Sequence, residues 1–384
     1  MTAQSQQNDS VSLLRDMPMG FGVGKYADFA AYVAHLERLR RLYPDRFAYH
    51  TDRKTFGGDY DLYWLTVGDT HKPAILFTSV LHARYEWKGA HLIMRLVEKL
   101  LDPADNQAIF NARFLNDFCL VGIPMVNTWG YFACAEGKHY NNHPAPVPEL
   151  EKADWHDMTH YREFRGVNLN RNFDWNWNDY PNLPFSVRSY WNGRDYGFAN
   201  YFMMPYVLNE RGEEIYDPEN KRPNHLLKPD PDIYDYKGEA AFSEPETRLI
   251  LDLFKLYRVV GFGDWHIMNP WQTNNTCYIS RAEQREVMMS LVNEGVARLN
   301  RRHPDLPAGL PQTSFQVMEE YDNSAPYSVN WAQNRMGVRS FSWETGTDFP
   351  EEVWTDAYLE ILYRTLCWLG TPRDGSGAAP GGCS

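Results

Sequence analysis

The chain has 384 residues, of which 43% are hydrophobic, so it is long enough to bury one large core or two modest ones. Acidic residues outnumber basic ones by 50 to 38, and the resulting charge of −12 argues against a nucleic-acid partner or an anionic membrane surface. No run of about 18 apolar residues is present that could span a bilayer.

The location of the protein is predicted from its first residues and its cysteines. Residues 1–24 read as a flexible arm without the apolar stretch of a signal peptide. Within this region "GFGVGK" lacks the Ser or Thr that follows the lysine of a phosphate loop. The five cysteines show no CxxC spacing, and any disulfide scheme leaves one unpaired. We therefore expect a soluble, cytoplasmic protein.

The first half of the chain predicts alternating helices and strands. Apolar residues recur at helical spacing over residues 26–42, and strand-like runs follow at Leu62–Val67 and Ala74–Leu81. The second run is apolar at successive positions, as is typical of a central strand covered on both faces. A helix is expected over Trp87–Leu101 and another buried strand over Phe118–Asn127.

The second half continues this alternation after a loop at residues 136–165, which is rich in His, Pro and charge. "FSEPETRLILDLFKLY" opens a helix with Ser243 three residues before Glu246, which is a capping-box spacing, and with Pro245 in the first turn. The later elements are strands at 258–266 and 338–344, helices at 283–302 and 351–369, and a disordered tail at 371–384. The pattern predicts an α/β fold, with one domain over residues 25–370 that is built on a mixed, mostly parallel twisted sheet with helices on both faces.

Three polar residues lie at the ends of predicted strands. His82 follows the strand ending at Leu81, and His266 and Glu344 end two later strands. Because ligands bind beyond the carboxyl ends of strands in open α/β sheets, these residues are expected to converge. Together with Glu86 they suit a zinc ion and a carboxylate base. Taken singly, the histidines could be satisfied strand-end residues, Glu86 an ordinary first-turn glutamate, and Glu344 a turn residue.

A short basic segment suggests the substrate. "REFRGVNLNRNFDW" contains Arg162, Arg165, Asn170 and Arg171. A planar guanidinium beside an amide is well suited to binding a carboxylate. The alternative is a solvated basic loop.

The motifs "LHARYEW", "GVNLNRNF", "AFSEPET", "DWH" and "WETG" occur in the order found in a known family. Over about residues 25–370 the chain resembles the carboxypeptidase A-like zinc metallopeptidases. The resemblance implies a zinc carboxypeptidase-like fold and one zinc ion per chain on His82, Glu86 and His266, the ligand set that carboxypeptidase A itself uses.

The resemblance also assigns roles around the metal. It implies that Glu344 is the general base and acid, and that Asn170 and Arg171 hold the terminal carboxylate of the substrate. Arg162, or alternatively Arg165, would polarise the scissile carbonyl.

The resemblance further concerns the part of the site that receives the substrate's terminal residue. Tyr321 falls near the family's mobile substrate-closing tyrosine, with Tyr327 as the alternative, although both could be packing residues. Val329 aligns with the base of the pocket for the terminal side chain, which favours an apolar or aromatic residue.

The chain departs from the family at two places. The family spaces its first ligand pair as H-x-x-E, whereas Glu86 stands four residues after His82 and Tyr85 takes the expected position. A bulge, or an i, i+4 arrangement on the first helical turn, could absorb the extra residue. An aromatic-rich insert at about residues 173–240 is either packed onto the sheet or forms a wall over the cleft.

The functional hypothesis is a zinc metallocarboxypeptidase that acts on a peptide or peptide-like substrate with a free carboxylate. One alternative is an amidase or deacylase using the same centre on another amide, and another is a catalytically silent binding module. The histidine pairs in "HYNNH" at 139–143 and "HDMTH" at 156–160 are either parts of a solvated loop or an accessory metal site.

Overall fold

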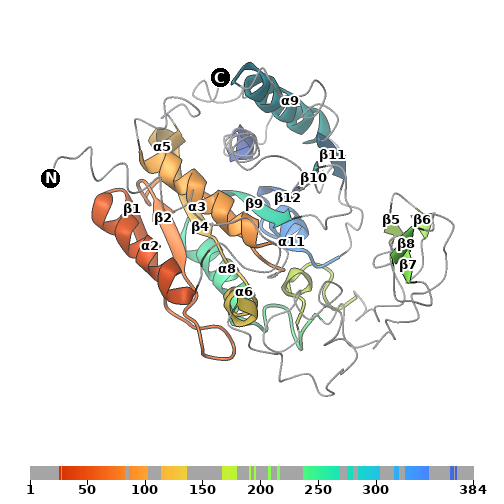
Figure 1. The fold of residues 1–384 in the computed structure, drawn as a ribbon, viewed down its shortest axis with the longest axis horizontal. Helices are drawn as coiled ribbons and strands as arrows, with labels where there is room; N and C mark the ends of the chain where they lie inside the picture. The colour runs from red at the N-terminus through yellow and green to blue at the C-terminus, as the bar shows by residue number, and fades with distance from the viewer. Residues whose placement is uncertain are drawn as a thin grey trace.

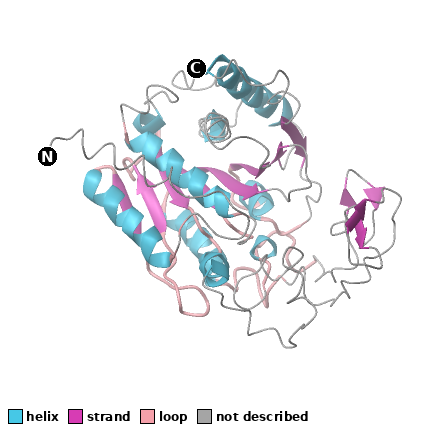
Figure 2. Cartoon of the chain, in the orientation of Figure 1, coloured by secondary structure: helices cyan, strands magenta, loops and turns pink. Residues whose placement is uncertain are grey.

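The computed structural model describes the central sheet and most of the helices packed on it (Figures 1 and 2). The described residues are 26, 28–82, 86–102, 114–135, 167–179, 190–191, 194–195, 206–208, 214–216, 237–267, 275–279, 284–302, 315–319, 325–345, 364–366 and 368–369. The predicted arm, the loop at 136–165, the tail and most of the aromatic insert lie outside these residues, so the predictions about them stay predictions.

An eight-stranded sheet forms the centre of the fold, in the order β1-β2-β4-β3-β9-β12-β10-β11. Its four middle strands are parallel: β4 (Cys119–Ile123), β3 (Ala74–Ser79), β9 (Val259–Ile267) and β12 (Arg339–Thr345). The outer strands are β1 (Phe47–His50), β2 (Trp64–Val67), β10 (Asn275–Ile279) and β11 (Phe315–Glu319). Antiparallel pairs join β1 to β2, β2 to β4 and β10 to β12, which confirms the predicted mixed sheet.

Helices cover both faces of this sheet. On one face α2 (Phe29–Leu42), α3 (Trp87–Leu101) and α6 (Thr128–Ala135) share an apolar core with Ile75 and Phe77 of β3. On the other face α8 (Pro245–Leu256) and α11 (Ser328–Asn334) pack with Ala74 and Leu76 of the same strand. Successive side chains of a strand point to opposite faces, so the uninterrupted apolar sequence of β3 is buried on both sides.

The remaining described elements are smaller or peripheral. They are α5 (Phe114–Asp117), α9 (Arg285–Arg302), the 3-10 helix η3 (Leu169–Arg171), and two hairpins formed by β5 (Tyr190–Trp191) with β6 (Arg194–Asp195) and by β7 (Tyr206–Leu208) with β8 (Glu214–Tyr216). None of the helices in the described part of the chain is long and apolar enough to cross a membrane.

Most predicted elements are present, with α3 beginning and ending at the predicted residues. Residues 364–366 and 368–369 are helical within the predicted helix at 351–369. The predicted strand at 118–127 ends at Ile123, because the chain then turns and the N–H groups of Val126 and Asn127 donate to carbonyls at the end of β3. The sequence analysis predicted none of the remaining elements, which are strands β1, β5–β8, β10 and β11 and helices α5, α6, η3 and α11.

The capping-box prediction for α8 is wrong. The N-cap is Glu244, not Ser243, although Pro245 does occupy the first turn. The Ser243 hydroxyl donates to Glu244 Oε1 at 2.6 Å and accepts from Asn172 Nδ2 at 2.9 Å. The serine therefore ties the segment after η3 to the start of α8.

Candidate metal centre

The carboxyl ends of three neighbouring parallel strands meet at one edge of the sheet. In the register of β9 and β12, His266 stands directly beside Glu344. In the register of β3 and β9, Ser79 stands beside Trp265, so the chain leaving β3 towards His82 emerges next to His266. The structure thus brings together the three strand ends whose convergence the sequence predicts.

The residue that follows β3 has an unusual backbone conformation. Val80 has a φ of 61°, which is the left-handed region that β-branched residues rarely adopt. Its carbonyl accepts from Asn127 N at 2.8 Å, and the Ser79 carbonyl accepts from Val126 N at 2.9 Å. The turn before α6 therefore holds a strained residue that directs the chain into His82.

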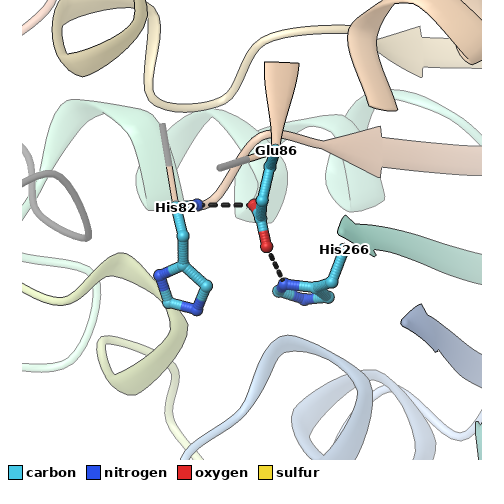
Figure 3. A group of neighbouring side chains, drawn as sticks. All are labelled: His82, Glu86 and His266. Carbon is cyan, nitrogen blue, oxygen red and sulfur yellow. Dashed lines mark hydrogen bonds and ion pairs between the residues drawn. The ribbon is translucent and has the colours of Figure 1, made fainter. Parts of the chain in front are cut away.

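His82, Glu86 and His266 form one cluster of possible metal ligands (Figure 3). One ligand atom from each residue lies within 4.8 Å of the others. Glu86 Oε1 lies 2.5 Å from Nδ1 of His266, and Oε2 accepts from the backbone N–H of His82 at 2.6 Å. Glu86 and His266 are buried, whereas His82 is partly exposed.

The unusual spacing of His82 and Glu86 does not keep the glutamate away from the cluster. Glu86 is the N-cap of α3, with φ of −99° and ψ of 7°, and the helix begins at Trp87. The suggested i, i+4 arrangement on a helical turn is therefore wrong, because His82 precedes the helix. Residues 83–85, which contain the extra residue, lie outside the described part of the chain.

Two buried acids, Glu86 and Asp264, and the half-buried Glu344 lie around His266, and these groups shift one another's pKa values. Burial lowers the pKa of His266, but Glu86 and Asp264 together raise it well above its ordinary value. Burial raises the pKa of Glu86, partly offset by His266. Burial, with repulsion from Glu86 and Asp264, raises the pKa of Glu344 to about 7 against the attraction of His266.

This charge balance fits a divalent cation. Three carboxylates, those of Glu86, Asp264 and Glu344, face one histidine that takes a proton to supply positive charge. Uncompensated buried anions are strongly unfavourable, so a bound cation would stabilise the cluster. Two imidazoles with one carboxylate form a donor set that zinc uses in catalytic sites.

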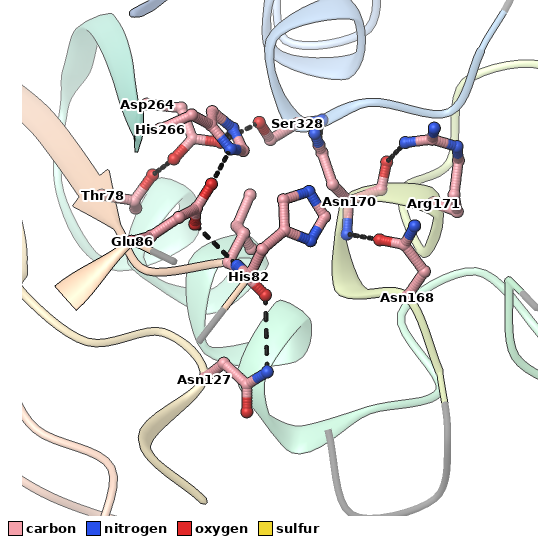
Figure 4. Close-up of polar contacts among 11 residues, drawn as sticks. Thr78, His82, Glu86, Asn127, Asn168, Asn170, Arg171, Asp264, His266 and Ser328 are labelled. Atoms are coloured by element: carbon pink, nitrogen blue, oxygen red, sulfur yellow. Dashed lines mark hydrogen bonds and ion pairs between the residues drawn. The ribbon is translucent and has the colours of Figure 1, made fainter. Parts of the chain in front are cut away.

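Asn170 and Arg171 lie on η3, beside the start of α11 (Figure 4). Asn168 caps η3 by accepting from Asn170 N at 3.1 Å, and Asn170 Oδ1 accepts from Ser328 N at 3.1 Å. Arg171 Nη1 donates to the Asn170 carbonyl at 3.2 Å. The predicted carboxylate-binding pair is therefore connected to α11.

Tyr327 supports Arg171. The guanidinium carbon of Arg171 lies 4.3 Å from the centre of the Tyr327 ring, and both side chains are buried. A buried ring stacked on a cation favours a supporting role for Tyr327 over that of a mobile closing residue. Val329 is buried in the core beside Leu169 and Trp331.

Some predicted site residues lie outside the described part of the chain. They are Arg162, Arg165, Tyr321 and the histidine pairs at 139–143 and 156–160. Their roles stay predictions.

Asp264 is a site residue that none of the sequence motifs indicates. It stands two positions before His266 on β9, and alternate residues of a strand share a face. That spacing within "DWH" was the available signal.

The sequence carries a family signature over part of its length. The model of the zinc carboxypeptidase family matches residues 32–194. The crystal structure of thrombin activatable fibrinolysis inhibitor covers 96% of this chain and 80% of its own, with 14% identity and a TM-score of 0.57. The chain has the zinc carboxypeptidase fold.

Other structures with the zinc carboxypeptidase fold align over similar lengths. Carboxypeptidase A from Helicoverpa armigera aligns over 96% of this chain and 79% of its own, with 16% identity and a TM-score of 0.53. A metallo-carboxypeptidase from Burkholderia cenocepacia covers 88% and 68%, with 13% identity and a TM-score of 0.51. No curated protein matches the sequence. In sequence motifs and fold the chain thus resembles the carboxypeptidase A-like zinc metallopeptidases.

Proposed function

We propose that the protein is a zinc-dependent metallocarboxypeptidase that removes the C-terminal residue of a peptide or peptide-like substrate. The observation that carries the proposal is the meeting of His82, Glu86 and His266 within 4.8 Å, beside Glu344 on the adjacent strand. The zinc carboxypeptidase fold supports the same reaction class.

His82, Glu86 and His266 would hold the zinc ion. Bound there, zinc would supply Lewis-acid activation of water and of the scissile carbonyl. Glu344 would accept the proton of the attacking water and deliver it to the leaving amine. Its pKa of about 7 in the chain without metal suits a group that must both take and give a proton near neutral pH.

Asn170 and Arg171 would select the substrate by binding its free carboxylate. Arg162 or Arg165 would polarise the carbonyl, Tyr321 would close over the substrate, and Val329 would lie at the base of the subsite for the terminal side chain. Arg171 is pre-oriented for carboxylate binding by the Tyr327 ring beneath its guanidinium.

Two measurements test this function. The purified protein should contain one zinc ion per chain, which a His82→Ala/His266→Ala double variant loses; a metal-free wild type would leave only a silent binding module. A peptide with a free C-terminus should be hydrolysed much faster than its C-terminal amide. Equal rates on the two peptides would contradict carboxypeptidase action and indicate a general amidase.

A further inference from the structure

Asp264 is a fully buried carboxylate that belongs neither to the predicted ligand set nor to the predicted acid–base chemistry. Its Oδ2 lies 3.2 Å from Nε2 of His266 and accepts the hydroxyl of Ser328 at 2.5 Å. Its Oδ1 accepts the hydroxyl of Thr78 at 2.8 Å. The carboxylate is therefore held by groups from β3, β9 and α11 (Figure 4).

The contacts of Asp264 determine which nitrogen of His266 is available to a metal. Nδ1 faces Glu86 at 2.5 Å, so Nδ1 is the nitrogen on the ligand side. A ligating Nδ1 must be unprotonated, and the ring proton must then stay on Nε2. Both oxygens of Asp264 accept hydroxyl groups, Oδ1 from Thr78 and Oδ2 from Ser328, so the carboxylate acts as an acceptor towards Nε2 and favours the tautomer with the proton on that nitrogen.

Ser328 connects this carboxylate to the carboxylate-binding segment. Its hydroxyl donates to Asp264, while its backbone N–H donates to Asn170 Oδ1 at 3.1 Å. Ser328 is the first residue of α11, where a backbone N–H has no partner within the helix. One residue thus contacts both the support of the metal ligand and the predicted substrate-binding amide.

We propose that Asp264 and Ser328 are positioning residues. Asp264 holds His266 in its metal-binding tautomer, and Ser328 supports Asp264 and fixes the Asn170 side chain relative to the metal centre. The proposal rests on the proposed zinc-dependent function. It assigns the Ser328 hydroxyl to the metal side of the site and the Ser328 N–H to the substrate side.

The metal side is tested by zinc affinity, measured by competition with a chromogenic chelator. Asp264→Asn should weaken zinc binding by about 10- to 100-fold, the range found for residues that orient metal ligands. Ser328→Ala should weaken it less, by about 3- to 10-fold, because Asp264 keeps its bond from Thr78.

Ser340→Ala is the matched control for Ser328→Ala. Ser340 is also a buried serine that anchors α11, through a 2.7 Å bond to the Val329 carbonyl on the same helix. The zinc affinity of the Ser340→Ala variant should stay within twofold of that of the wild type. If Ser328→Ala and Ser340→Ala lower the affinity equally, Ser328 acts only through the stability of α11 and the proposal fails.

The tautomer is tested directly by nitrogen NMR of ¹⁵N-histidine in the zinc-loaded protein. The wild type should show a protonated Nε2 and a metal-shifted Nδ1 for His266. In the zinc-free protein, at a pH where His266 is neutral, the wild type should keep its proton on Nε2, and Asp264→Asn should add a second population with the proton on Nδ1, because an amide can donate as well as accept. An unchanged His266 spectrum in this variant would overturn the role of Asp264.

The substrate side is tested by Ser328→Pro compared with Ser328→Ala. Both variants lack the hydroxyl, and only proline also lacks the N–H that binds Asn170. Proline is tolerated at the first helical position, and Tyr327 already has the extended conformation, with ψ of 153°, that a following proline requires.

Relative to Ser328→Ala, Ser328→Pro should raise KM for the free-acid peptide about tenfold with little further change in zinc affinity. Equal KM values for Ser328→Pro and Ser328→Ala would show that the Ser328 N–H does not support substrate binding through Asn170. A wild type that neither binds zinc nor cleaves peptides would instead refute the proposed function, so the two failures are distinguishable.

Discussion

Replacing Glu344 with glutamine should stabilise the zinc-free protein at alkaline pH. Burial raises the pKa of Glu344 from 4.5 to about 7. A carboxyl whose pKa is raised on folding contributes most stability below its unfolded pKa, and this contribution is lost as pH rises through the folded pKa. This rise in pKa corresponds to a cost of about 3 kcal/mol for ionising Glu344 in the folded chain. Because the side chain is partly exposed to solvent, we expect a measured cost of about 1–3 kcal/mol.

The assay is urea unfolding of the zinc-free wild type and Glu344→Gln between pH 5 and pH 8.5. The advantage of the glutamine variant should be small at pH 5, grow through pH 7 and level off above it. Zinc should shrink or reverse this advantage, because a nearby cation favours the ionised glutamate. A stability difference that does not change with pH would refute the reasoning.

Three further substitutions probe the supports of the site. Gly89→Ala would place a Cβ 1.9 Å from the Ser79 hydroxyl, so it should lower the free energy of unfolding, measured by urea titration, by about 1–3 kcal/mol. The double variant Gly89→Ala/Ser79→Ala should recover part of this loss. Asn172→Ala removes hydrogen bonds to the carbonyls of residues 237 and 240 and should lower the free energy of unfolding by about 2 kcal/mol in the same titration; an unchanged free energy would show that these bonds do not hold the segment after η3 to residues 237–240. Tyr327→Leu should raise KM for free-acid peptides about fivefold, whereas Tyr327→Phe keeps a ring under Arg171 and should not.

The elements with strong periodic patterns were predictable from the sequence. The helix at Trp87–Leu101 has a clear apolar face, and the strand at Ala74–Ser79 is apolar throughout because both of its faces are covered. Strand β10 reads "NTCYI", a short run in which polar and apolar residues do not alternate as they do in a half-buried strand. It forms because β11 and β12 supply partners on both sides, and such long-range pairing leaves no local signal.

The convergence of the site was predictable for a different reason. His82, His266 and Glu344 follow or end strands, and parallel neighbours bring their carboxyl ends to one edge whatever lies between them in the chain. Asp264 and Ser328 could not be assigned in the same way. Their roles depend on α11 packing against β9, which places a serine hydroxyl 2.5 Å from an aspartate 64 residues away.

The spacing of His82 and Glu86 illustrates what a ligand motif specifies. Along the chain the two residues are four apart, yet Glu86 Oε2 accepts the backbone N–H of His82 while Oε1 reaches His266. The same carboxylate therefore joins the exit of β3 to the end of β9. Because α3 starts directly after Glu86 and packs against both of these strands, the helix fixes the carboxylate relative to the sheet rather than to the preceding residues. A residue inserted before Glu86 can lengthen the connection without moving the ligand atom, so the distance from the sheet edge, not the interval in the sequence, determines whether the two side chains can share an ion.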